Sequence, residues 1–332
     1  MLAPLPSRLI TTGISAGTAL LMAATVPGAQ AEPAAPNRPV IGVSFPPAVK
    51  PQIKYTRTFG QAKGSVEITF RDDRMRPTGF MSGDTTQTQQ LNSKSNNWKR
   101  SFSVRITKAT GVARSRPVSL TVKVSCGKGA RSCKPSAQVT KTVALNRTAN
   151  FDFTITSYGK KIHNHKPMLV LTFTSAPAVP VTTSAPAMGT VRCDSEKATN
   201  GGKRGCVYPA VVPNFSLSRT NPKWGAMAKH IYDAQRALDG KPGYGKPLHR
   251  TTPAQAKKNR QKTCPSSLTR PRGKQCDEYP YASAKEGGGV LGKPQSRKMI
   301  AAEHNRQGGN QLGHFYNAHR ILPGDTFYSR VN

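Results

Sequence analysis

Short runs in which apolar and polar residues alternate dominate the first half of the chain. They are rich in β-branched and aromatic residues, and Gly, Pro, Asn and Ser separate them. The five runs span residues 66–70, 102–106, 120–124, 151–155 and 169–173. A period of two places successive side chains on opposite faces of a strand, so each run predicts a half-buried strand. Their near-regular spacing predicts an antiparallel, sandwich-like all-β domain over residues 41–176.

A Pro/Ala/Thr-rich stretch at residues 177–190 interrupts this pattern and predicts a linker. Residues 191–332 are then expected to form a second domain, of the α+β class. Its first apolar stripe includes Met227, Ile231 and Ala234 at helical spacing, which predicts a helix over residues 225–238. His230 lies one position from this stripe, so we expect it to pack or to face solvent rather than to bind a ligand.

The remainder of the second half alternates between loop-like and regular patterns. Residues 241–275 are rich in Gly, Pro, Lys and Arg and predict loops. Residues 298–302 predict a short strand, residues 309–320 a helix, and residues 325–331 a closing strand. The order predicted around the candidate chemistry is therefore strand, strand, helix.

The N-terminus has the pattern of a secretory signal peptide. Arg8 precedes an apolar run at residues 10–26, and Ala29-Gln30-Ala31 forms a small-x-small cleavage site. The run is too short and too rich in Gly and Thr for a membrane anchor, and no later segment has the length of a span. We therefore expect residues 1–31 to be removed and the mature protein to be secreted and extracellular, without a membrane span.

The chain contains six cysteines, which an exported protein is expected to use in disulfides. Six cysteines allow fifteen connectivities, and the spacing alone favours pairing between neighbours. The neighbouring pairs are Cys126 with Cys133, Cys193 with Cys206, and Cys264 with Cys276. None of the pairs has the two-residue spacing of a zinc knuckle, so a zinc site is disfavoured.

The charge balance points to polyanionic partners. Lys and Arg number 50 against 15 Asp and Glu, which gives a formal net charge of +35. A chain with this charge is expected to bind nucleic acid, anionic cell wall or membrane headgroups. The basic β-rich domain could accordingly contact an anionic cell surface, or its charge could merely keep it soluble.

Two short strings in the basic second half carry candidate chemistry. Asp277 and Glu278 are adjacent at a predicted strand end, and Asn305 and Arg306 precede a predicted helix. Phosphodiester hydrolysis needs a base that activates water and a hard cation that neutralises charge on the phosphate. Mg²⁺ takes oxygen ligands and keeps most of its waters, so a carboxylate and an Asn carbonyl could suffice. Without further support, an Asp-Glu pair is more often surface charge.

Positive side chains near these strings are candidates for binding the phosphate backbone of DNA. Arg306 could hold a phosphate oxygen, while Arg272 and Lys274 precede the acidic pair directly. Contacts of this kind add affinity without sequence specificity. They could equally be solvated loop residues.

Several strings that recur in order carry a family resemblance. Cys276-Asp277-Glu278-Tyr279-Pro280-Tyr281-Ala282-Ser283 is followed by Asn305-Arg306, and then by Gly324-Asp325-x-Phe327. Over residues 260–332 the chain resembles the NucA/NucB-type secreted bacterial deoxyribonucleases. The resemblance implies a ββα-metal core and metal-dependent endonucleolytic cleavage of DNA, with Mg²⁺ or Mn²⁺ and little sequence specificity.

The resemblance also implies roles for individual residues. Asp277 stands where related ββα-metal nucleases use a histidine base, so it is the expected general base, with Glu278 as an auxiliary carboxylate. Asn305 corresponds to the metal ligand. The family often has an acidic residue directly before that Asn, whereas here His304 occupies the position and Glu303 precedes it. Glu303 is thus a second candidate ligand, and His304 a candidate acid for the leaving group.

The sequence as a whole predicts a secreted, metal-dependent and sequence-nonspecific DNA endonuclease with an N-terminal β-rich accessory domain. The alternative is a non-enzymatic polyanion-binding or cell-surface adhesion protein with a degenerate nuclease module. Cleavage of DNA that depends on Asp277 and Asn305 separates the two hypotheses.

Overall fold

The computed structural model describes residues 39–46, 52–127, 132–159, 161–288 and 295–332. The predicted signal peptide at residues 1–31 lies outside these ranges. Across the described ranges, none of the helices combines the length and the apolar character that crossing a membrane requires.

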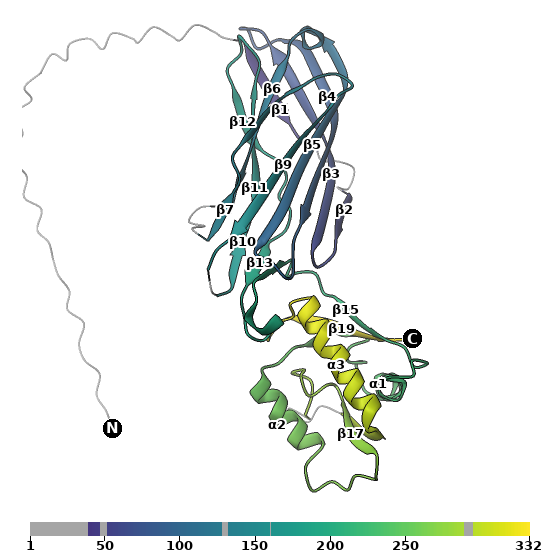
Figure 1. Cartoon of the computed structure of the whole chain (residues 1–332). Helices are drawn as coiled ribbons and strands as arrows, with labels where there is room; N and C mark the ends of the chain where they lie inside the picture. The colour runs from purple at the N-terminus through teal and green to yellow at the C-terminus, as the bar shows by residue number, and fades with distance from the viewer. Residues whose placement is uncertain (1–38, 47–51, 128–131, 160, 289–294) are drawn as a thin grey trace, which may run out of the picture. The chain divides into compact units, whose positions relative to one another are not determined.

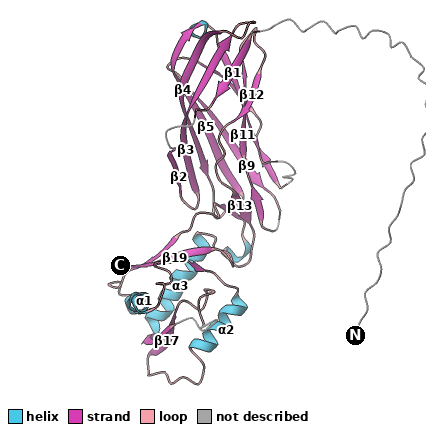
Figure 2. Ribbon diagram, turned by 180° about the vertical axis from the view of Figure 1, so that it is seen from behind, coloured by secondary structure: helices cyan, strands magenta, loops and turns pink. Residues whose placement is uncertain are grey.

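The first half of the chain is built almost entirely from β-strands, as predicted (Figures 1 and 2). Its larger sheet has seven strands, in the order β1-β3-β4-β5-β9-β7 with β2 also paired to β3. All of these pairings are antiparallel. The strands are β1 Val40–Ser44, β2 Gln52–Tyr55, β3 Phe59–Arg71, β4 Pro77–Gln90, β5 Asn97–Gly111, β7 Cys133–Pro135 and β9 Thr148–Ser157.

A second, four-stranded antiparallel sheet has the order β12-β11-β6-β8. Its strands are β12 Val181–Ser184, β11 Met168–Thr174, β6 Val118–Ser125 and β8 Val139–Val143. Alternate residues of both sheets, such as Ile68, Phe102 and Leu171, belong to one buried hydrophobic cluster. The five runs predicted from alternation all lie within strands, namely β3, β5, β6, β9 and β11.

The stretch at 177–190, expected to be a linker, takes part in this core. It contains β12, which pairs with β11, and both Ala185 and Met188 are buried. A small sheet follows, in which β13 Val191–Asp194 lies between β10 His163–His165 and β14 Gly205–Val207. Two short 3₁₀ turns complete this half, η1 Val112–Arg114 and η2 Asn200–Gly202.

The C-terminal part of the chain has a second hydrophobic cluster of its own. Its elements, in chain order, are β15 Asn214–Leu217, α1 Gly225–Ala237, β16 Leu248–His249, α2 Pro253–Thr263, β17 Lys274–Tyr279, β18 Ser296–Ala301, α3 Ala302–Ala318 and β19 Thr326–Val331. Strand β19 lies between β15 and β16, and β17 pairs with β18 in an antiparallel hairpin. The predicted helix at 225–238 corresponds to α1.

Helix α2 contradicts the prediction that residues 241–275 are loops. Thr252 caps it by accepting a hydrogen bond from the Gln255 amide at 3.2 Å, and Pro253 occupies the first turn, where a missing N–H costs nothing. The helix has no apolar stripe, because its buried positions are the polar residues Asn259 and Thr263. Hydrophobic periodicity therefore could not reveal it.

Helix α3 begins at Ala302, earlier than the predicted start at 309. Within this helix, Gly308 packs closely against α1. A Cβ atom at Gly308 would overlap the side chain of Met227 on α1. The earlier start places Asn305 and Arg306 in the first turns of α3, rather than ahead of it.

Buried ion pairs join β13 and the turn before β3 to the C-terminal part. Asp325 accepts hydrogen bonds from Arg192 at 2.7 and 2.8 Å and from Arg57 at 2.8 Å. Arg320 and Asp194 form a second pair that is fully buried. A buried carboxylate without such a partner would destabilise the folded state. Loss of either partner should therefore destabilise both the β-rich part and the C-terminal part of the chain.

The three disulfides join neighbouring cysteines, which confirms the pairing favoured by spacing. They are Cys126–Cys133, Cys193–Cys206 and Cys264–Cys276. Three disulfides fit a protein of an oxidising, extracellular compartment.

Candidate functional site

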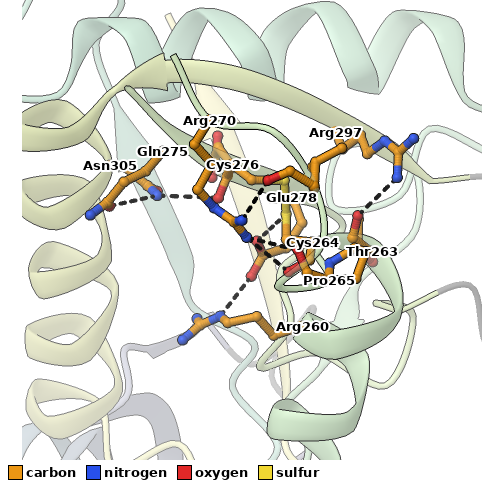
Figure 3. Close-up of a disulfide and its surroundings, with 12 residues drawn as sticks. Arg260, Thr263, Cys264, Pro265, Arg270, Gln275, Cys276, Glu278, Arg297 and Asn305 are labelled. Carbon is orange, nitrogen blue, oxygen red and sulfur yellow. Dashed lines mark hydrogen bonds and ion pairs between the residues drawn. A yellow bond between two sulfur atoms is a disulfide. The ribbon is translucent and has the colours of Figure 1, made fainter. Parts of the chain in front are cut away.

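The hairpin of β17 and β18 and the helix that follows it form the framework of the candidate site. Asp277 of β17 lies opposite Lys298 of β18, and α3 begins directly after β18. The Cys264–Cys276 disulfide ties the C-terminal end of α2 to β17, one residue before Asp277 (Figure 3). Helix α2, β17 and α3 are thereby held around a common space.

That space is a cavity of about 570 Å³. Its lining includes Glu278 of β17, Asn305 and Arg306 of α3, Arg260 of α2 and Arg270 of the following loop. The structure thus brings together three of the residues selected from the sequence, Glu278, Asn305 and Arg306. The excess of guanidinium groups over carboxylates makes the cavity suitable for an anionic ligand such as a phosphate.

Glu278 is almost buried, with 8% of its surface exposed. Its Oε1 accepts a hydrogen bond from Arg260 Nε at 3.2 Å, and its Oε2 lies 3.4 Å from Sγ of the disulfide-bonded Cys264 (Figure 3). Burial raises the pKa of Glu278, and the charge of Arg260 only partly opposes this effect.

Asn305 is held over the edge of β17 by its amide nitrogen. Asn305 Nδ2 donates two long hydrogen bonds of 3.4 Å, to Gln275 Oε1 and to the Cys276 carbonyl. With the amide group oriented in this way, Oδ1 is the atom that can accept a hydrogen bond or bind a cation.

Asp277 lies on the other face of β17, because successive side chains of a strand point to opposite sides. Its Oδ2 is 2.7 Å from Nδ1 of His230 on α1, and only 4% of Asp277 is exposed. Tyr279, two residues further along, contacts the same helix through a 2.8 Å hydrogen bond from Gln235 Nε2. Burial raises the pKa of Asp277, although the hydrogen bond to His230 opposes the rise.

The sequence indicated no link between His230 and the acidic pair, whereas the structure places His230 against Asp277. His230 is 2% exposed, and its second nitrogen, Nε2, lies 2.9 Å from Ser296 Oγ on β18. The signal was present in the spacing, since position 230 follows Met227 by three residues and precedes Ala234 by four, which places it on the buried face of α1. What the spacing could not show is that its partner is Asp277.

Four other predicted residues lie apart from the cavity lining or face solvent. Glu303 is exposed and its carboxylate accepts hydrogen bonds from Arg306 at 2.6 and 3.0 Å and from Gln307 at 2.7 Å. His304 Nδ1 accepts a hydrogen bond from the Ala226 amide at 3.1 Å, which joins the first turns of α3 and α1. Arg272 and Lys274 are exposed in and after the turn that leads into β17.

The donor set near the cavity suits a hard, hydrated cation better than zinc. Among the described residues, no three or more His, Cys, Asp and Glu side chains gather in a way that could hold a metal. The side-chain oxygens that line the cavity include the carboxylate of Glu278 and Oδ1 of Asn305. Mg²⁺ commonly binds through one or two protein oxygens and retains its waters, so this small set fits it.

Comparison with known proteins identifies a family that resembles the region carrying this site. No curated protein matches the chain at a significant level. One family model matches a region that begins after His230 and α1 and covers β16, α2, β17, β18, α3 and the first four residues of β19. Residues 239–329 match the family model of deoxyribonuclease NucA/NucB, which confirms the resemblance seen in the sequence and supports a deoxyribonuclease function for the C-terminal region.

Proposed function

We propose that the protein is a secreted, metal-dependent DNA endonuclease with little sequence specificity, and that its C-terminal part carries the reaction. The observation that supports this most is the coincidence of the family match with a cavity. Within residues 239–329, Glu278, Asn305 and Arg306 line one polar space, and Asp277 adjoins Glu278 on β17.

The arrangement of elements supports a ββα-metal core. Two antiparallel strands, β17 and β18, are followed without a gap by α3, which contributes Asn305. In such a core the strands supply the base and the helix supplies a metal ligand. We assign these roles to Asp277, which lies on the face of β17 away from the cavity, and to Asn305 on α3.

Asp277 is the proposed general base. It would take a proton from a water molecule as that water attacks phosphorus and as the bond from phosphorus to the leaving oxygen breaks. Burial raises the pKa of Asp277, and a carboxylate with a higher pKa is a stronger base. Its low exposure in the absence of DNA does not exclude it, because catalytic geometry often forms fully only with substrate.

Glu278 and Asn305 are the proposed ligands of a divalent cation, Mg²⁺ or Mn²⁺. When bound there, the cation would neutralise negative charge on the phosphate and on the leaving oxygen. Glu303 is a weaker candidate ligand, because Arg306 and Gln307 already engage its oxygens. His304 could protonate the leaving oxygen only through Nε2, because Nδ1 is bonded to the Ala226 amide.

Binding of DNA is proposed to rest on phosphate contacts. Arg260, Arg270 and Arg306 surround the cavity, and Arg272 and Lys274 extend the basic surface along the approach to β17. Contacts with phosphates carry no base information, so we expect low sequence specificity. The net charge of +35 would draw the whole protein to DNA.

A second candidate function is polyanion binding without cleavage, by a degenerate nuclease module. Two observations favour it: the burial of Asp277 against His230, and the pairing of Glu303 with Arg306. Plasmid nicking in Mg²⁺ and in EDTA, by the wild type and by Asp277→Ala, separates the two functions. An endonuclease nicks only in Mg²⁺ and loses activity with Asp277, whereas a binding protein shifts the plasmid in a gel and never cuts it.

A further inference from the structure

The buried contact between α1 and β17 joins a histidine outside the family match to the proposed base. His230 Nδ1 lies 2.7 Å from Asp277 Oδ2, and His230 Nε2 lies 2.9 Å from Ser296 Oγ. His230 is 2% exposed and Asp277 is 4% exposed, so the contact between them is shielded from water, whereas the contact with Ser296 is partly buried. The family match begins at residue 239, after this histidine.

The donors can be assigned for one protonation state, an ionised Asp277 beside a neutral His230 ring. An ionised Asp277 can only accept, so Nδ1–H of His230 donates to it. In the neutral ring Nε2 is then the acceptor, and the hydroxyl of Ser296 donates to it. Each of the two ring nitrogens therefore has one partner, and the ring cannot rotate without losing both bonds.

Helix α1 contacts β17 at a second point that serves as an internal comparison. Gln235 Nε2 donates to Tyr279 Oη at 2.8 Å and to the Ser329 carbonyl at 2.9 Å, and this residue is as well buried as His230. The two contacts come from one helix and reach alternate residues of one strand. A purely structural role for His230 predicts that losing either contact has similar consequences.

We propose that His230 is a positioning residue for Asp277, because its hydrogen bond to Oδ2 holds the carboxylate in a single orientation. This inference rests on the proposed function of Asp277 as the base. Orientation of a catalytic group by a buried hydrogen bond is worth large factors in rate, because a small misplacement of a reacting atom slows the reaction about 100-fold. Ser296 completes the arrangement by fixing the ring tautomer.

The test compares four single variants and one double variant of the full-length protein for single-turnover cleavage of duplex DNA in saturating Mg²⁺. His230→Leu removes the donor but keeps apolar volume. His230→Asn keeps a donor close to the position of Nδ1. Gln235→Leu is the matched control, and Asp277→Asn supplies the background for a double variant with His230→Leu. Thermal unfolding of each variant is recorded in parallel.

A positioning role predicts that His230→Leu lowers the maximal rate about 100-fold, with KM within about threefold of the wild-type value. His230→Asn should recover about tenfold of this loss, and Gln235→Leu should keep the wild-type rate at temperatures where it is folded. In the Asp277→Asn background, His230→Leu should cause no further loss, because the residue acts through Asp277.

Three results would overturn the inference. One is an equal loss of rate in Gln235→Leu and His230→Leu. Another is full activity of His230→Leu while Asp277→Asn is inactive, a result that leaves the proposed function intact. The third is full activity of Asp277→Asn, which would defeat the assignment of the base itself, and the inference with it.

Discussion

Removal of the Cys264–Cys276 disulfide tests whether the position of β17 controls activity. The disulfide closes a segment with a sequence separation of 12, and it joins α2 to β17 directly before Asp277. Replacing both cysteines by Ala raises the conformational entropy of the unfolded chain. By the loop-closure estimate this lowers the free energy of unfolding by about 3 kcal/mol. For a region of this size, such a loss lowers Tm by about 6–12 °C.

The same change has a local consequence that stability alone does not explain. The sulfur of Cys264 lies 3.4 Å from Glu278 Oε2, and Cys276 lines the same cavity as Glu278 and Asn305. We expect β17 to shift relative to α2, so that the cleavage rate falls about 10- to 100-fold at 25 °C, where the protein remains folded.

The Cys126–Cys133 disulfide provides a matched control in the β-rich half. Its sequence separation is 7, so its removal costs a comparable amount, about 2.5 kcal/mol. Single-turnover cleavage of duplex DNA by the two double-Ala variants, with circular dichroism to establish folding, compares them directly. The reasoning is refuted if both variants cleave at the wild-type rate, or if both lose activity in proportion to their loss of stability.

Three further predictions follow from the charged residues. Burial alone would raise the pKa of Asp325, but its hydrogen bonds and ion pair with Arg192 lower the pKa below its usual value. The stability that this group contributes is present above about pH 4 and is lost as the pH falls through the lowered pKa. Urea unfolding should show that Asp325→Asn costs about 3 kcal/mol at pH 7 and less at pH 3. Replacing Arg272 and Lys274 by Gln should weaken binding to duplexes of any sequence and reduce the slope of log K against log salt by about 2, measured by fluorescence anisotropy; an unchanged slope would place them outside the DNA contact. Glu278→Gln should raise the Mg²⁺ concentration for half-maximal cleavage about tenfold or more, and an unchanged Mg²⁺ requirement would remove it from the cation site.

The strands of the first half could be predicted because each buries one face. Alternation in residues 66–70 or 169–173 reflects a core on one side and water on the other, and both runs lie in strands. Helix α1 was predictable for the same reason, from Met227, Ile231 and Ala234. Helix α2 was not, because its buried residues, Asn259 and Thr263, are polar and give no hydrophobic period.

The candidate site was predictable in its parts but not in its arrangement. The sequence places Asp277 and Glu278 side by side, but strand alternation sends them to opposite faces, one to His230 and the other to the cavity with Asn305. Arg260 was beyond prediction as a partner of Glu278, because it depends on the unpredicted helix α2. Tertiary contacts between distant segments decide these pairings, and no local pattern encodes them.

Hydrolysis of DNA through Asp277 with a divalent cation is the function proposed for this protein. The most direct measurement is the single-turnover cleavage rate of a labelled duplex by the wild type and by Asp277→Asn, each in Mg²⁺ and after EDTA. We predict cleavage by the wild type in Mg²⁺ alone, and a rate at least about 1,000-fold lower for a folded Asp277→Asn that still binds the duplex. Cleavage that persists in EDTA, or that proceeds at the wild-type rate in Asp277→Asn, would contradict the account.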